Sequence, residues 1–328
     1  AVSEDSEVDL VGLVRIARRE PKFDFRGHQD EDTNPLYRGF GNEKREQVEQ
    51  YDEPVLLRIA TRDETELRSG FPVDAEVLFE YHALILDDVE SEFFTRDQMS
   101  LIQRFVSQRG GGFLMLGGME SFAAGNYRNT PIGEMLPVYP VAVDTPVLSD
   151  RFRVALTREG MLEPWMRLRA TEVAERQRLD AMPEFRIVNL IDSIKPGATV
   201  LNRVLSTSGE SYPAVVAQRF GSGRTLAVTL GDLWRWSLRR DPDAPDELGK
   251  AWRQTMRWLV ADVPQRVDVD VTQPKDSSSQ TANLRIVVRD PTFQPLDNAS
   301  VVVNVEDPSG EMTRLVAEAS DTEAGVYE

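Results

Sequence analysis

Residues 81–116 constrain the fold of this chain more than any other segment. Two continuous apolar runs, at 81–86 and 111–116, flank residues 95–108, whose apolar side chains recur at helical spacing. A capping box at Thr95 marks the start of that helix, and a run of three glycines ends it. The order strand, helix, strand predicts a βαβ unit, in which the two strands lie parallel and helices cover both faces of the sheet.

The remainder of the first 263 residues also alternates between predicted strands and helices. Short apolar runs at 10–16 and 54–60 are typical of strands, and the polar segment 20–51 between them predicts a long irregular excursion. Further strands are expected at 198–204, 214–220 and 225–230, with a tight turn at 221–223, a charged surface helix at 171–181 and an amphipathic helix at 245–260. We therefore expect one α/β domain over residues 1–263.

The pattern changes after residue 263. Short runs of strand character at 267–271, 284–288, 301–305 and 314–318 are separated by turn signals, a spacing typical of an immunoglobulin-like β-sandwich. Only four or five strands fit before the sequence stops, so residues 264–328 are expected to form a partial sandwich. The sequence lacks an initiator Met and stops inside a strand-like run, so we expect a segment of a longer protein.

Composition excludes several classes of function. The chain carries 38 Lys and Arg against 55 Asp and Glu, a net charge of −17, so no nucleic-acid partner is expected. The absence of cysteine excludes thiol catalysis and disulfides, and two histidines, His28 and His82, argue against a multi-histidine metal site. No apolar run approaches the ~18 residues of a membrane span, so the segment itself is expected to be soluble.

Polar residues follow three predicted strands at the edge where parallel sheets bind ligands. These candidates for a binding crevice are Asp87, Asp88 and Glu90 after the first strand, Gly117, Gly118, Glu120 and Ser121 after the second, and Asp232 and Trp234 after the third.

Each candidate has more than one interpretation. Asp87, Asp88 and Asp232 could hold Ca²⁺ or Mg²⁺, although no loop has the spacing of a calcium motif, and a solvated or arginine-paired rim is favoured. Ser121 would need a nearby base, but His82 belongs to the opposite edge of the sheet, so an ordinary loop serine is favoured. Trp234 and its neighbouring tryptophans could stack a sugar, although packing of the last helix onto the sheet is favoured.

Three stretches, YHALILDDVE (81–90), RGGGFLMLGG (109–118) and GSGRTLAVTLGDLWRW (221–236), resemble a glutamine amidotransferase family of bacterial envelope proteins, within the class I glutamine amidotransferase-like superfamily. The resemblance covers about residues 8–262 and implies a flavodoxin-like αβα sandwich with a mostly parallel sheet. It also implies a catalytic Cys on a strand-to-helix elbow and a later His. Here Gly117 and Gly118 form that elbow, and Asp232 stands where a relative has His.

These departures imply a catalytically inactive amidotransferase-like domain. We expect a binding or assembly module without a cofactor, whose partner is another protein or other domains of the same chain. The resemblance places it on the extracytoplasmic side of a membrane-anchored protein, with flanking segments supplying the anchor. Two alternatives remain open: a carboxylate- or metal-dependent hydrolase that uses the acidic crevice, and a carbohydrate-binding module.

Overall fold

The computed structural model describes residues 5, 7–15, 21–26, 46–51, 56–143, 145–238, 245–272, 282–306 and 309–328. These residues divide into two compact units. The smaller unit is Ser6–Phe71, and the larger comprises Ala1–Asp5 and Pro72–Glu328. Each unit is described by itself.

The described residues of the smaller unit contain two antiparallel strand pairs. Strand β1 (Gly12–Arg15) pairs with β4 (Leu56–Ile59), and both strands fall within the predicted runs. Strand β2 (Pro21–Arg26) pairs with β3 (Glu46–Tyr51), so the expected irregular excursion over 20–51 is wrong at both of its ends. The alternation of aromatic and polar residues in PKFDFR has the period of a strand and explains this difference. Residues 27–45 lie outside the described residues.

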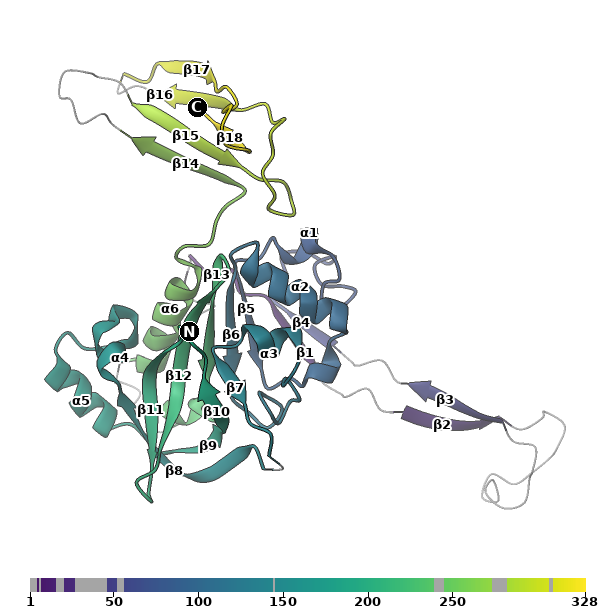
Figure 1. The fold of residues 1–328 in the computed structure, drawn as a ribbon, viewed down its shortest axis with the longest axis vertical. Helices are drawn as coiled ribbons and strands as arrows, with labels where there is room; N and C mark the ends of the chain where they lie inside the picture. Colours follow the sequence, from purple (N-terminus) through teal and green to yellow (C-terminus); the bar gives the residue numbers. More distant parts are fainter. Residues whose placement is uncertain are drawn as a thin grey trace. The chain divides into compact units, whose positions relative to one another are not determined.

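A seven-stranded mixed sheet lies at the centre of the larger unit (Figure 1). In spatial order its strands are β5 (Ala83–Asp87), β6 (Gly112–Leu116), β13 (Gly223–Val228), β12 (Ser211–Phe220), β11 (Thr199–Ser206), β8 (Val147–Leu156) and β9 (Phe185–Asn189).

The expected mostly parallel sheet is wrong. Of the neighbouring pairs in this sheet, β5–β6 and β6–β13 are parallel, whereas the other four are antiparallel. A parallel connection needs a crossover of about a dozen residues or more. Strands β11, β12 and β13 follow one another through short turns, so they can only run antiparallel.

The predicted βαβ unit is confirmed. Helix α2 (Arg96–Ser107) joins the parallel strands β5 and β6. The Thr95 hydroxyl accepts a hydrogen bond from the Gln98 amide at 3.2 Å, and the Thr95 amide donates to the Gln98 side chain at 3.0 Å. This reciprocal capping box is the one that the sequence predicts.

Helices α2 and α6 (Glu247–Val260) cover opposite faces of the sheet (Figure 1). A Cβ atom added to Gly111 would meet the Phe105 ring of α2 at 2.3 Å, and one added to Gly112 would meet Leu259 of α6 at 2.5 Å. Because successive strand residues point to opposite faces, the two helices form the two outer layers. Only glycine lets both helices approach the sheet so closely.

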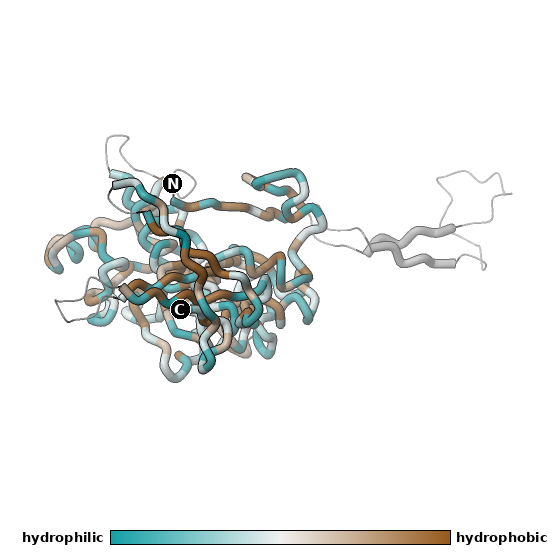
Figure 2. The backbone as a smooth tube through the Cα atoms, turned by 90° about the horizontal axis from the view of Figure 1, so that it is seen from above, coloured by the Kyte–Doolittle hydropathy of each residue, from teal (hydrophilic) through white to brown (hydrophobic). Residues whose placement is uncertain are grey.

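One hydrophobic core lies between the sheet and α6. Strands β6 and β13 are buried along their whole lengths, and hydrophobic segments run through the middle of the larger unit (Figure 2). Leu114 and Leu226 from these strands pack in one cluster with Met256 and Leu259 of α6. The apolar stripe of α6 predicted from sequence therefore faces the core.

Shorter elements complete the α/β part of the larger unit. They are the helices α1 (Ala75–Leu78), α3 (Pro131–Met135), α4 (Arg158–Leu162) and α5 (Glu172–Asp180), the 3₁₀ turns η2 (Ser91–Phe93), η3 (Pro164–Met166) and η4 (Leu233–Trp236), and the paired strands β7 (Val138–Pro140) and β10 (Ile191–Ile194). In the described part of the chain, no helix combines the length and the apolar character needed to cross a membrane.

Residues 264–328 contain two small antiparallel sheets. One sheet has the order β14 (Val267–Thr272), β15 (Asn283–Val288), β18 (Val326–Tyr327), and the other pairs β16 (Val302–Glu306) with β17 (Met312–Val316). Their small core is built around Ile286, Val288 and Tyr327. The expected strands are therefore present, whereas an immunoglobulin-like arrangement of them stays a prediction.

Candidate functional site

The carboxyl ends of β5, β6 and β13 lie at one edge of the sheet, because these three strands are neighbours and parallel. The candidate residues follow these three strand ends along the chain. A side-chain contact joins the first two ends: the Asp88 carboxylate accepts a hydrogen bond from the Glu120 amide at 2.7 Å. Asp88 itself has the left-handed backbone angle φ 51°, which turns the chain at the end of β5.

The elbow after β6 has no room for a side chain. A Cβ atom added to Gly117 would lie 2.6 Å from the Thr229 carbonyl oxygen and 2.7 Å from the Leu230 carbonyl carbon. A Cβ atom added to Gly118 would lie 2.1 Å from the Asp88 carboxylate. The obstacle at Gly117 is the backbone that follows β13, which cannot move aside as a flexible side chain could. Glycine at this position is therefore a packing requirement of the fold.

Asn189, at the end of β9, holds the residue after the elbow. Its side chain accepts a hydrogen bond from the Gly118 amide and donates one to the Gly118 carbonyl, both at 2.9 Å, and it is 1% exposed. In elbow enzymes the amide after the nucleophile helps to stabilise the oxyanion. Here that amide is already bound by a buried side chain. Sequence analysis missed Asn189 because it lies far from the elbow along the chain.

Asp232 connects the segment after β13 to the start of β9. Its carboxylate accepts hydrogen bonds from the amides of Arg186 at 2.8 Å and Ile187 at 3.4 Å. The Arg235 guanidinium lies 3.4 Å away, and Asp232 is 2% exposed. The arginine-paired interpretation therefore describes this residue, and both carboxylate oxygens contribute to holding the two segments together.

The other acidic candidates lie closer to solvent. Protein packed around the Asp87 carboxyl raises its pKa, and the neighbouring negative charge of Asp88 raises it further. Glu90 and Glu120 are half-buried. Among the described residues, no three acidic or histidine side chains are grouped closely enough to hold a metal ion.

Ser121 and the histidines do not meet in the described structure. Ser121 is buried at the carboxyl end of β6, whereas His82 is exposed just before the start of β5, at the opposite edge of the sheet. The His82 ring lies 3.3 Å from the Gln265 side-chain oxygen. His28 lies outside the described residues.

The tryptophans divide into two groups. Trp236, Trp252 and Trp258 pack against the core between the sheet and α6, as the favoured interpretation predicts. Trp258 also stacks on Trp165, with ring centroids 4.4 Å apart and planes 20° apart. Trp234 is 56% exposed, with the Arg235 guanidinium 5.6 Å from its ring centroid.

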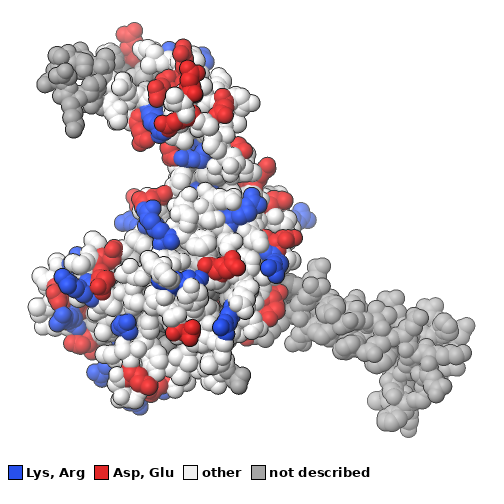
Figure 3. Space-filling model, viewed as in Figure 1, with Lys and Arg blue, Asp and Glu red and all other residues white. Residues whose placement is uncertain are grey.

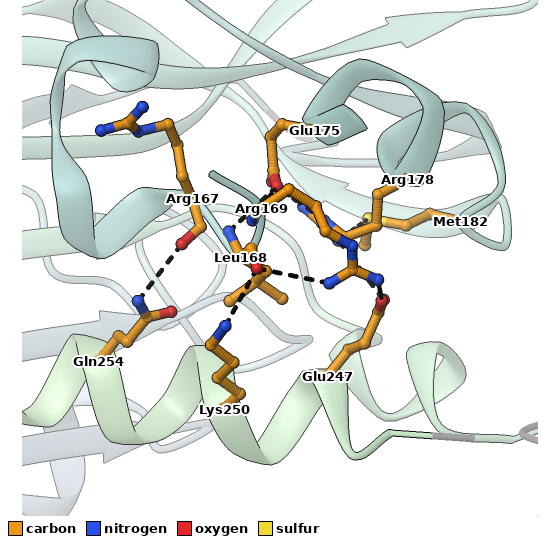
Figure 4. A network of polar contacts seen from close by, with 9 residues as sticks. All are labelled: Arg167, Leu168, Arg169, Glu175, Arg178, Met182, Glu247, Lys250 and Gln254. Atoms are coloured by element: carbon orange, nitrogen blue, oxygen red, sulfur yellow. Dashed lines mark hydrogen bonds and ion pairs between the residues drawn. The ribbon is translucent and has the colours of Figure 1, made fainter. Parts of the chain in front are cut away.

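A buried polar network that sequence analysis missed joins α5 to α6 (Figure 4). The Glu175 side chain is fully buried and accepts hydrogen bonds from the amides of Leu168 and Arg169, at 3.0 and 2.8 Å, and from the Arg178 guanidinium. Glu247 of α6 pairs with Arg169, and its other carboxylate oxygen lies 3.8 Å from Arg178. The predicted charged surface helix exists, but one turn of it is buried in the domain.

The charged groups of the surface are mixed in sign. Figure 3 shows Lys and Arg side chains interspersed with Asp and Glu over the visible face of the described residues. The described residues on this face therefore form no continuous basic stripe.

Comparisons with solved structures find distant similarities. A GH42 β-galactosidase from G. stearothermophilus is 15% identical, with 75% of this chain and 31% of that chain covered and a TM-score of 0.33. A ThuA-like protein from Bacteroides uniformis is 13% identical, with 60% and 75% covered and a TM-score of 0.35. A β-galactosidase from the haloarchaeon Halorubrum lacusprofundi is 12% identical, with 75% and 31% covered and a TM-score of 0.29. This chain therefore spans about a third of the β-galactosidases' length.

Sequence comparison identifies the family. No curated protein matches the chain. A family model described as "Putative glutamine amidotransferase" matches residues 58–261, which is more than half of the chain. This chain therefore belongs to that glutamine amidotransferase-like family.

Proposed function

We propose that the amidotransferase-like domain of this chain is catalytically inactive and serves as a binding or assembly module of a larger envelope-associated protein. The observation that carries the proposal is the contact between Gly117 and the backbone of residues 229–230. A nucleophile needs a side chain at the elbow, and the fold leaves no space for one. The chain also has no cysteine anywhere.

Two further contacts support inactivity. The Gly118 amide, which would face an oxyanion in an active relative, is bound by Asn189. Asp232, at the position of the relative's His, uses its carboxylate to hold β9 and Arg235. These hydrogen bonds hold β9 against the segments that follow β6 and β13. The same contacts disfavour a hydrolase built on Asp232, because its oxygens already have donors.

The edge of β14 supports an assembly role. Val267, Val269 and Val271 alternate along this strand and are 55%, 55% and 61% exposed. Among the described strands, β14 pairs with β15 alone. An exposed strand edge with an apolar stripe is the surface to which a partner chain adds a strand. We propose that the partner is another protein, or another domain of the same chain, on the extracytoplasmic side.

Ammonia release from glutamine tests the inactive state. We expect the purified chain to show no turnover above the protein-free blank, and Ser121→Ala to leave that result unchanged. Turnover in the wild-type chain that Ser121→Ala abolishes would show that the domain is an enzyme with a serine nucleophile.

A further inference from the structure

A cavity of about 120 Å³ lies between the sheet and α6, and the proposed function does not use it. Strands β8, β11, β12 and β13 supply one wall, and α5, α6 and η3 with the segments beside them supply the other. Nearly all of its lining is apolar or aromatic, including Val154, Leu226, Trp236, Leu248, Ala251 and Trp252. An apolar cavity of about 150 Å³ in another protein stays dry and binds benzene, so this space suits one six-membered ring.

One buried polar side chain in this lining has no partner. Asn202 of β11 is 8% exposed, and its side-chain oxygen makes no hydrogen bond within the described residues. The β11–β12 register is irregular on both sides of Asn202. Such irregularities re-aim side chains and are frequent beside binding sites. A buried amide oxygen without a donor has lost its water without replacement, so a ligand that donates a hydrogen bond there gains affinity.

A donor without a partner lines the same cavity. The indole nitrogen of Trp165 is buried and makes no hydrogen bond among the described residues. Its ring is held by stacking on Trp258. A hydroxyl group both donates and accepts, so it matches an amide oxygen and an indole N–H. An apolar ring alone would leave both groups unsatisfied.

The charges at the cavity wall balance each other. Arg178 lines the cavity, and its guanidinium bonds to the fully buried Glu175 carboxylate at 2.5 Å (Figure 4). Glu247 lies 3.8 Å from the same guanidinium. A charged ligand would therefore find no uncompensated charge among the groups that line this space, and burying it would be costly. The lining selects a neutral molecule.

From these observations, we propose that the cavity is a binding site for a small neutral molecule with one apolar six-membered ring and one hydroxyl group. The ring fills the apolar space, and the hydroxyl donates to Asn202 and accepts from Trp165. The class is a monocyclic phenol or cyclic alcohol. This inference is independent of the inactive elbow, because none of the elbow residues lines the cavity.

The test compares phenol with toluene, which has the same shape but no hydroxyl. Binding is measured on the full chain by ligand-observed NMR and isothermal titration calorimetry. A purely apolar cavity would favour toluene, because the phenol hydroxyl loses its water on entry. The proposal predicts that phenol binds at least ten-fold tighter. Asn202→Leu should remove this preference while toluene binding persists, and Ala251→Phe should fill the cavity and abolish binding of both.

Asn283→Leu is the matched control, because Asn283 is exposed on β15 and outside the cavity lining. This variant should keep the preference for phenol. Two results with the wild-type chain alone would overturn the proposal. In one, toluene binds as tightly as phenol, and in the other, neither ligand binds. Phenol binding that survives Ala251→Phe would place the ligand elsewhere and would also overturn it.

Discussion

The guanidinium of Arg109 lies over the ring of Phe293, with its central carbon 3.9 Å from the ring centroid. Arg109 follows α2, is 2% exposed, and donates hydrogen bonds to the carbonyls of Phe79 at 3.0 Å and Pro264 at 2.7 Å. Burial and the nearby positive charge of Arg289 lower the pKa of Arg109 to about 10, so it is still charged at neutral pH. The Arg109 side chain thus links the end of α2 to Pro264, which precedes β14, and to Phe293, which follows β15.

Replacing Arg109 should weaken this link. Arg109→Met removes the donor to the buried Phe79 carbonyl, at a cost of about 1–3 kcal/mol, and the donor to the half-buried Pro264 carbonyl. We expect a loss of several kcal/mol in the free energy of unfolding, measured by urea denaturation, and faster tryptic cleavage between residues 261 and 267. The control is Arg128→Met, because Arg128 is exposed, and it should change stability by less than about 0.5 kcal/mol. Equal proteolysis of the two variants would show that Arg109 does not hold the C-terminal strands.

Two glutamates of α5 provide a second comparison. Glu175→Ala leaves the Arg178 charge buried without its main partner and two amides without an acceptor, so we expect a loss of about 3–5 kcal/mol. Glu172→Ala on the same helix removes an exposed pair with Arg176 and should cost less than about 1 kcal/mol. Thermal unfolding of both variants measures the difference. Similar melting temperatures would show that the buried network contributes little.

Short-range sequence patterns were sufficient to predict the main helices and the two strands of the βαβ unit. The capping box at Thr95 and the apolar stripe of α6 were sufficient for the two main helices, and continuous apolar runs marked β5 and β6. The burial of Glu175 could not be predicted, because a charged helix with weak periodicity is typical of a surface. The mixed sheet was missed for another reason. The family resemblance implies a mostly parallel sheet, whereas the tight turn at residues 221–223 requires β12 and β13 to be antiparallel.

The elbow supplies a third prediction. Gly117→Ala forces a methyl group against the backbone at residues 229–230, so we expect a loss of at least about 2 kcal/mol. Gly117→Cys should be at least as unstable and should release no ammonia from glutamine. In the control Gly197→Ala, no atom lies within 4 Å of the new methyl group, so only the backbone strain at φ +83° remains, about 1 kcal/mol. A fully stable Gly117→Ala variant would contradict the packing described for the elbow.

The raised pKa of Asp87 predicts a pH dependence of stability. The folded chain binds the Asp87 proton more tightly than the unfolded chain, whose aspartates titrate near pH 3.9. Between that pH and the higher folded pKa, the folded state carries more protons, so the contribution of Asp87 to stability falls as pH rises. Asp87→Asn should therefore raise the melting temperature at pH 7 and leave it almost unchanged at pH 3. The same rise at both pH values would mean that titration is not the cause.

The sequence indicated which strand ends carry the candidate residues, but not which of their polar groups are already hydrogen-bonded. The sequence placed Asp87, Gly117 and Asp232 at one sheet edge, because three parallel strands end there. It could not show that Asn189 binds the Gly118 amide, since that contact depends on how β9 returns to the end of β13. The sequence could not show that the Asn202 side-chain oxygen is buried without a hydrogen bond, because that depends on which residues surround it in the fold.

Titration of the ¹⁵N-labelled chain with glutamine tests the central claim most directly. The amide signals of Gly117, Gly118 and Ser121 report on the elbow, and the Gly118 amide is already bound by Asn189. Because Asn189 occupies the Gly118 amide, we expect these signals not to move at millimolar glutamine. Saturable shifts of the Gly118 and Ser121 amides would show that glutamine displaces Asn189 at the elbow, and would contradict the occupied state on which the inactive assignment rests.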